Sequence, residues 1–143
     1  MKKALRVLAL LLLLGFVGIQ FVPVERSNPP VEEEIAAPPE VAAILERACY
    51  DCHSHETRWP WYSRVAPVSW LVAEDVKDGR RHLNFSRWNQ YDERRRAGKL
   101  REVVELTSEG EMPLWFYLPL HPSARLSSDD LETLAKWVEA SKG

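Results

Sequence analysis

The chain has 143 residues, with 19 lysines and arginines against 21 aspartates and glutamates, and only two cysteines. This length fits one domain rather than two. The formal net charge of −2 argues against the strongly basic surface that nucleic-acid-binding domains use, so we expect no nucleic-acid partner.

The N-terminus predicts a membrane anchor over residues 1–24. Lys2, Lys3 and Arg6 precede an apolar run over residues 7–24, which as a helix would be about 27 Å long, marginally enough to cross a bilayer core. The run does not end in the small residues of a cleavage site, which favours an uncleaved anchor over a signal peptide. Because a basic flank stays in the cytoplasm, we expect a single-pass protein of the cytoplasmic membrane with its C-terminal domain in the periplasm or extracytoplasmic space.

Residues 25–39, "ERSNPPVEEEIAAPP", are acidic and rich in proline, which predicts a flexible linker. Without the three basic residues of the N-terminus, 16 basic residues remain against 21 acidic ones, a net charge of −5. The folded domain is then predicted over residues 40–143. An apolar core of this size gives marginal stability, so support from a cofactor or a covalent link is common.

Four further helices are expected before the C-terminal one. Apolar residues at helical spacing predict a helix over residues 40–48; they are Val41, Ile44, Leu45 and Ala48. Pro67 suits the first turn of the next helix, which we expect to stop at Asp78-Gly79. The third and fourth are predicted over residues 86–97, ending at Gly98, and residues 100–108.

The clearest helix lies in "LSSDDLETLAKWVEAS" near the C-terminus. Ser127 or Ser128 can cap it, and acidic residues fill its first turn. Its predicted buried stripe consists of Leu131, Leu134, Ala135 and Val138. No strand pattern or internal repeat is evident, so the predicted fold class is all-α, a small helical domain with long loops.

Both cysteines lie in "RACYDCHSH", where Cys49 and Cys52 stand three apart. A disulfide would close a very small loop and stabilise little. A thiol–disulfide catalyst would place its cysteines at the start of a helix beside a βαβ unit, whereas here a helix precedes them. A structural zinc site could add His53 and His55, although four ligands within seven residues are unlike the usual paired spacing.

The alternative that fits best is covalent haem attachment. C-x-x-C-H is the haem c signature, in which each thiol bonds to one vinyl group and the adjacent histidine binds the iron. We therefore predict one covalent haem c, with thioethers at Cys49 and Cys52 and His53 as an axial iron ligand.

The second axial ligand is predicted to be Met112, in "SEGEMPLWFYLP". It is the only methionine apart from the first residue, and its flanking residues are unlike a core helix. His121, on a loop before the last helix, is the main alternative, and His82 and His55 follow. A surface or hydrogen-bonding role is the simpler expectation for His82 and His55.

Several tryptophans and arginines are candidates for the haem pocket. Trp59 and Trp61 are expected to cover the haem edge, unless they are ordinary core residues. Arg80 and Arg81 could pair with the haem propionates, unless they are solvated surface residues. Further tryptophans of the same kind are Trp70, Trp88 and Trp115.

Five stretches together resemble the bacterial haem-binding domain family, whose members are short, membrane-tethered and related to cytochromes c. They are "CYDCHS", "TRWPWYSRVAPVSW", "DVKDGRRHLNFSRW", "GEMPLWFYLPLHPSARLS" and the closing amphipathic helix, and the likeness spans about residues 10–140. It implies haem attachment at Cys49 and Cys52 and an axial role for His53. The Met112-Pro113 pair and the last helix also resemble the methionine loop and C-terminal helix of small class I cytochromes c.

The expected function is single-electron transfer by a membrane-anchored, cytochrome c-like protein with redox protein partners. We expect no enzymatic activity, because both axial positions would be filled. The alternative is a haem-based sensor or small-ligand-binding module with a displaceable sixth ligand, and peroxidase-like chemistry would need the same open position.

Overall fold

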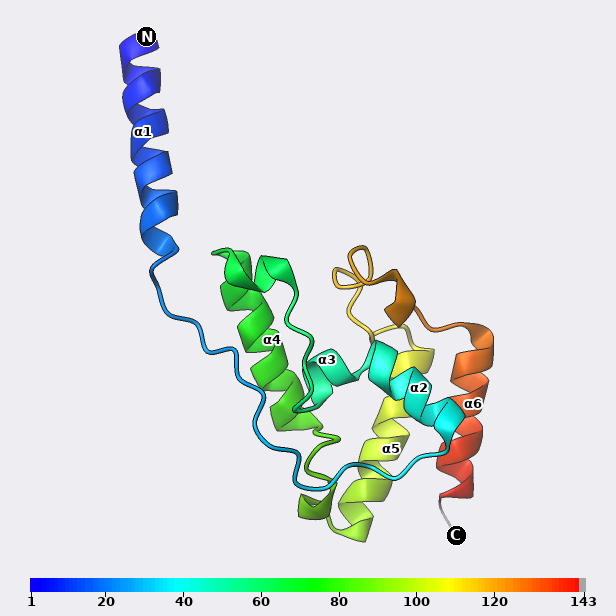
Figure 1. The fold of residues 1–143 in the computed structure, drawn as a ribbon. Coiled ribbons are helices and arrows are strands. Elements are labelled where there is room, and N and C mark those ends of the chain that lie inside the picture. The colour runs from blue at the N-terminus through cyan, green and yellow to red at the C-terminus, as the bar shows by residue number, and fades with distance from the viewer. Residues whose placement is uncertain (142–143) are drawn as a thin grey trace.

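The computed structural model describes residues 1–141 of the chain, in which the regular elements are helices joined by long loops (Figure 1). Within those residues the only β pairing is one isolated bridge, between Glu33 and Arg87. The helical character therefore agrees with the expected all-α class. The α-helices are α1 (Lys2–Ile19), α2 (Pro39–Ala48), α3 (Tyr50–His53), α4 (Val68–His82), α5 (Glu93–Ser108) and α6 (Ser128–Ala140), and the 3₁₀ helices are η1 (Trp61–Arg64), η2 (Trp88–Gln90) and η3 (Pro122–Ala124).

The expected membrane span is wrong. Of the helices in residues 1–141, not one combines the length and the apolar character needed to cross a membrane. α1 projects away from the helices that follow it (Figure 1), but it includes the three basic residues and ends at Ile19, so the last part of the apolar run lies outside it. The expected single-pass topology and the location in the cytoplasmic membrane relied on this span and are therefore not supported.

The segment expected to be a flexible linker packs on the domain over part of its length. Glu32 and Glu33 donate their backbone N–H groups to the Ser86 carbonyl, at 2.9 and 3.2 Å, and Ile35 donates to the Phe85 carbonyl at 3.0 Å. The Ile35 side chain is buried. The acidic and proline-rich composition concealed this one apolar anchor and the partner segment that takes up the backbone hydrogen bonds.

The apolar core lies where α2, α5 and α6 meet. α6 packs against both α5 and α2, as Figure 1 shows at the lower right of the molecule. The predicted stripe of α2 is confirmed for its first three members, while Ala48 is half-buried. Phe85 and Trp88, which follow α4, stack on each other and complete this core. Its members in α2, α5 and α6 are Val41, Ile44, Leu45, Leu100, Val103, Leu134 and Val138, and Tyr50 joins them from α3.

The cap predicted for α6 is confirmed. The Ser127 hydroxyl accepts a hydrogen bond from the Asp130 backbone N–H, and the Asp130 carboxylate accepts one from the Ser127 backbone N–H. This reciprocal pair satisfies two of the N–H groups that a helix start leaves without partners. Of the predicted stripe, Leu134 and Val138 are buried, Leu131 is half-buried and Ala135 is exposed.

Two of the glycines expected to end helices, Gly98 and Gly79, do not end them. Gly98 lies inside α5, so the predicted third and fourth helices are largely one, beginning after the cap that Asp92 supplies to the Arg95 N–H. A glycine in a helix costs only about 1 kcal/mol relative to alanine, which packing of the α5 stripe offsets. Gly79 likewise lies inside α4, which continues to His82.

Candidate functional site

A cavity of about 770 Å³ lies between α3, α4, α5 and the loop that follows α5. This volume falls within the range of about 300–1,000 Å³ typical of cofactor and ligand sites. Of the residues considered for the site, six line it: Cys49, Cys52, His53, Trp61, His82 and Met112. Its apolar wall includes Val68, Leu71, Val72, Val76, Leu83, Phe85, Val103, Leu106, Leu114 and Phe116.

The His53 ring is oriented by two backbone carbonyls of α4 and its end. Nδ1 lies 3.0 Å from the Gly79 oxygen and 3.1 Å from the Leu83 oxygen, and carbonyls only accept, so Nδ1 carries the proton. Nε2 then keeps its lone pair for a metal ion. Burial lowers the pKa of this imidazole, outweighing the opposite effect of the two carbonyls, and so favours the neutral form.

Gly79 also allows α4 to approach the cysteine motif closely. A Cβ atom added at this position would lie 2.5 Å from the Cys52 backbone oxygen. Any larger residue would therefore push α3 and α4 apart, and with them the ring of His53 and the carbonyl it contacts. Glycine here serves packing at the site rather than helix termination.

The two cysteines are free thiols, partly shielded from solvent. Burial is the main cause that raises the pKa of both Cys49 and Cys52 to about 12. A thiol–disulfide catalyst needs a lowered thiol pKa, so this environment argues against that alternative.

The zinc alternative also lacks support. In residues 1–141, no group of three or more His, Cys, Asp or Glu side chains is placed to hold a metal ion. His55, its fourth proposed ligand, is buried with Nδ1 bonded to the Pro30 carbonyl at 2.8 Å and Nε2 to the Asn84 amide at 2.9 Å. Both ring nitrogens are thus engaged away from the cavity.

Met112 and His121, the two main candidates for the sixth ligand, differ in position. Met112 lines the cavity, directly after the turn that Gly110 makes with a positive φ of 75°. His121 is not among the lining residues; its Nε2 is 2.6 Å from the Tyr62 hydroxyl. His82 lines the cavity from the end of α4. It lies three residues after Gly79, whose carbonyl orients His53, so it belongs to the same side of the cavity as His53.

The structure separates the predicted tryptophans. Trp61 lines the cavity mouth and is 74% exposed. Trp59 does not line the cavity, and its Nε1 donates to Asn28. Trp88 belongs to the core, whereas Trp70 and Trp115 are exposed.

Neither predicted arginine faces the cavity. The Arg80 guanidinium donates to the carbonyls of Ser54 and Ser27 and to the side chains of Asn28 and Thr57, so its donors are used within the protein. Arg81 pairs with Asp78 on the surface. Besides His53, the basic residues that do line the cavity are Arg58, His82 and Lys99.

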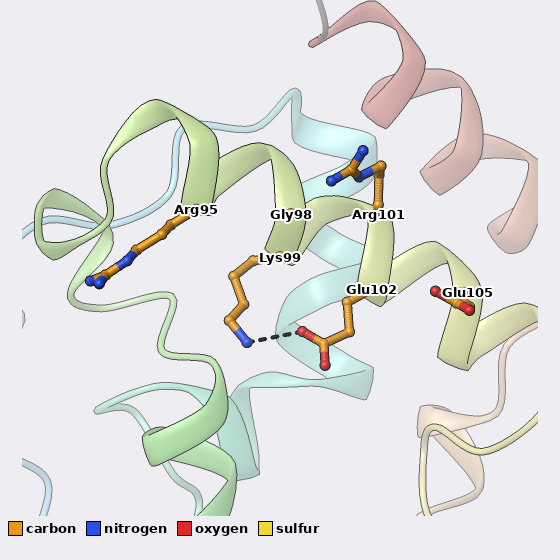
Figure 2. Close-up of a pocket in the computed structure, with 6 residues that line it drawn as sticks. All are labelled: Arg95, Gly98, Lys99, Arg101, Glu102 and Glu105. Atoms are coloured by element: carbon orange, nitrogen blue, oxygen red, sulfur yellow. Dashed lines mark hydrogen bonds and ion pairs between the residues drawn. The ribbon is translucent and has the colours of Figure 1, made fainter.

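A second depression lies along α5, and Figure 2 shows its lining residues. Lys99 forms an ion pair of 2.9 Å with Glu102, drawn as a dashed line, and these two residues also belong to the cavity lining. The depression is open and contains no cysteine, histidine or methionine. The larger cavity is therefore the candidate site.

Sequence reasoning missed a set of polar contacts beside the cysteine motif. Asp51 accepts a hydrogen bond of 2.7 Å from the Tyr117 hydroxyl. Tyr117 stacks on His121, with ring centroids 3.9 Å apart and planes within 7°. No local pattern signals a contact between residues 66 positions apart.

Comparison with known proteins identifies the family of the chain. Residues 14–140 match the family model described as a haem-binding domain. The chain belongs to that family. The resemblance noted in the sequence is thereby confirmed, and the haem-binding domain assignment covers the whole cavity. No curated protein and no solved structure matches the chain.

The residues present fit a haem. The cavity is of cofactor size and largely apolar, and it presents two thiols, an imidazole with a free Nε2 and a thioether. These are the donor types that attach and ligate haem in proteins.

Proposed function

We propose that the cavity holds one covalent haem c, bonded to Cys49 and Cys52 and ligated by His53. The observation that carries this proposal is the orientation of His53 by the Gly79 and Leu83 carbonyls, which leaves Nε2 free on a wall shared with both thiols. Each thiol would add its sulfur and its hydrogen across one vinyl double bond, so attachment consumes no oxidant. When bound, the haem supplies reversible one-electron oxidation and reduction of its iron.

Met112 is proposed to hold the haem iron together with His53. Its side chain belongs to the cavity lining, whereas the Nε2 atom of His121 is already bonded to Tyr62. A thioether is a neutral, soft ligand that favours ferrous over ferric iron and so raises the reduction potential. The apolar walls act in the same direction, because they exclude water and disfavour the more highly charged state.

The function that follows is single-electron transfer with redox protein partners, rather than catalysis of bond making. If His53 and Met112 both held the iron, no position would be left for a substrate there. The protein around the haem would orient the imidazole through two backbone carbonyls, hold the thioether and keep water out of the cavity. A displaceable Met112 would instead make the site a sensor or small-ligand-binding module, an alternative favoured by its position on a loop rather than a helix.

The test uses the full chain produced in a host with a haem c maturation system. We expect one haem per chain that survives denaturation and acid extraction, and no retained haem after Cys49→Ala with Cys52→Ala. The ferric spectrum should be low-spin with a sulfur-to-iron charge-transfer band. High-spin ferric iron with fast binding of carbon monoxide would support the sensor, and one zinc with no iron would refute haem binding at this site.

A further inference from the structure

The methionine loop, residues 109–121, joins the end of α5 to η3. Its first part is tied to α5, because the N–H groups of Glu111 and Met112 donate to the Leu106 carbonyl at 2.9 and 3.1 Å. Beyond Met112 the backbone curls on itself: Tyr117, Leu120 and His121 each donate to a carbonyl three residues earlier. These short turns shape the loop without attaching it to the rest of the protein.

Two side-chain hydrogen bonds attach the far part of the loop across the cavity. The Tyr117 hydroxyl donates to Asp51 Oδ2 at 2.7 Å, and Nε2 of His121 is bonded to the Tyr62 hydroxyl at 2.6 Å. Because Tyr117 and His121 stack face to face, they act as one unit with two attachments. Asp51, Tyr62 and Tyr117 all line the cavity.

Asp51 is itself held in place before it meets the loop. Its Oδ1 accepts from the Arg58 backbone N–H at 2.8 Å, which leaves Oδ2 for Tyr117. Its backbone carbonyl accepts from the Thr57 hydroxyl at 2.8 Å. A hydrogen bond to an ionised carboxylate is about twice as strong as one between neutral groups. Since Asp51 lies between Cys49 and Cys52, this anchor is part of the attachment motif.

We propose that Asp51 and Tyr117 are positioning residues: their hydrogen bond closes the methionine loop over the cavity and holds Met112 where it can reach the iron. The consequence for the iron rests on the proposed role of Met112 as sixth ligand. A methionine side chain has three rotatable bonds and a thioether is a weak ligand, so a loosened loop lowers the effective concentration of its sulfur at the metal. One motif would then bond the cofactor and fix its distal ligand.

Tyr117→Phe tests this proposal, because it removes one oxygen and keeps the ring that stacks on His121. Tyr91→Phe is the matched control: its hydroxyl accepts from the Asn84 N–H at 3.0 Å, and its ring packs on Trp88 in the core. In the holoprotein we expect amide hydrogen exchange of residues 111–121 to accelerate at least about tenfold in Tyr117→Phe and to stay unchanged in Tyr91→Phe. Binding of carbon monoxide to the ferrous protein should accelerate in the first variant alone.

Unchanged exchange of residues 111–121 in Tyr117→Phe would overturn the proposal. So would an increase spread evenly over α2 and α6, since that would show general destabilisation rather than loop opening. The proposed function fails in a different way. If the wild-type protein lacks the sulfur band and its loop still loosens in Tyr117→Phe, Met112 is not the ligand, while the attachment of the loop by Asp51 and Tyr117 is supported.

Discussion

The two halves of this domain are stabilised by different means. The half built from α2, α5 and α6 packs its own apolar side chains, with Leu45 and Leu134 fully buried. The half built from α3, α4 and the methionine loop surrounds a cavity together with one side of α5, and leaves Leu71 and Phe116 exposed at its rim. The apolar side chains of the first half bury one another, whereas the apolar wall of the second half needs a bound cofactor to cover it.

Stability should therefore depend on the core half, and haem properties on the cavity half. A substitution in the core half should change the free energy of unfolding. A substitution in the cavity half should instead change the haem spectrum.

Leu134→Ala should have the largest effect on unfolding. Removing a fully buried leucine leaves a cavity in the core, and such changes cost about 2–5 kcal/mol. Leu71→Ala, at the 52%-exposed rim, should cost less than about 1 kcal/mol. Chemical denaturation of both variants checks this difference, and equal losses would contradict the division of the domain into two halves.

Gly79→Ala lies where the halves meet and should affect both properties. Its new Cβ would collide with the Cys52 carbonyl, and overpacking of this kind costs about 1–3 kcal/mol. Displacement of α4 should also disturb the His53 ring, so we expect reduced haem retention and an altered low-spin spectrum.

Gly98→Ala is the matched control for Gly79→Ala. It adds the same methyl group in a helix where nothing lies within 4 Å, so it should raise stability by up to about 1 kcal/mol and leave the spectrum unchanged. Similar effects of the two substitutions would show that the close approach of Gly79 to Cys52 is unimportant.

Met112→Ala should have the smallest effect on unfolding, less than about 1 kcal/mol, because the side chain lies in the cavity lining outside the core. Its effect on the iron should be the largest of the set, a change to high-spin ferric haem open to added ligands. Met112→His should stay low-spin at a lower potential. If His121→Ala rather than Met112→Ala produces high-spin iron, the sixth ligand is His121.

Sequence reasoning worked best where the information is local. The stripe of α2 and the cap of α6 depend on residues within two turns of each other. It failed where a distant partner decides the outcome. Gly79 looked like a helix end because its reason, the Cys52 carbonyl, belongs to another helix.

A distant partner also explains why some residues predicted for the haem pocket do not line the cavity. Arg80 looked available for a propionate, but four acceptors from two other segments use its donors. The link between Asp51 and Tyr117 could not be predicted either, since only the folded chain brings the cysteine motif and the methionine loop together.

The contacts of Arg80 also bear on where the cooperative folding unit begins. Its guanidinium links Ser27 and Asn28 to Ser54 and Thr57 through hydrogen bonds. Farther along the same N-terminal segment, the Ile35 N–H donates to the Phe85 carbonyl. A protease should therefore spare residues 27–36 for as long as α4 remains folded. A fragment trimmed to Pro39 would lose those acceptors and the cover over Phe85, and would unfold more readily than its intact helices suggest.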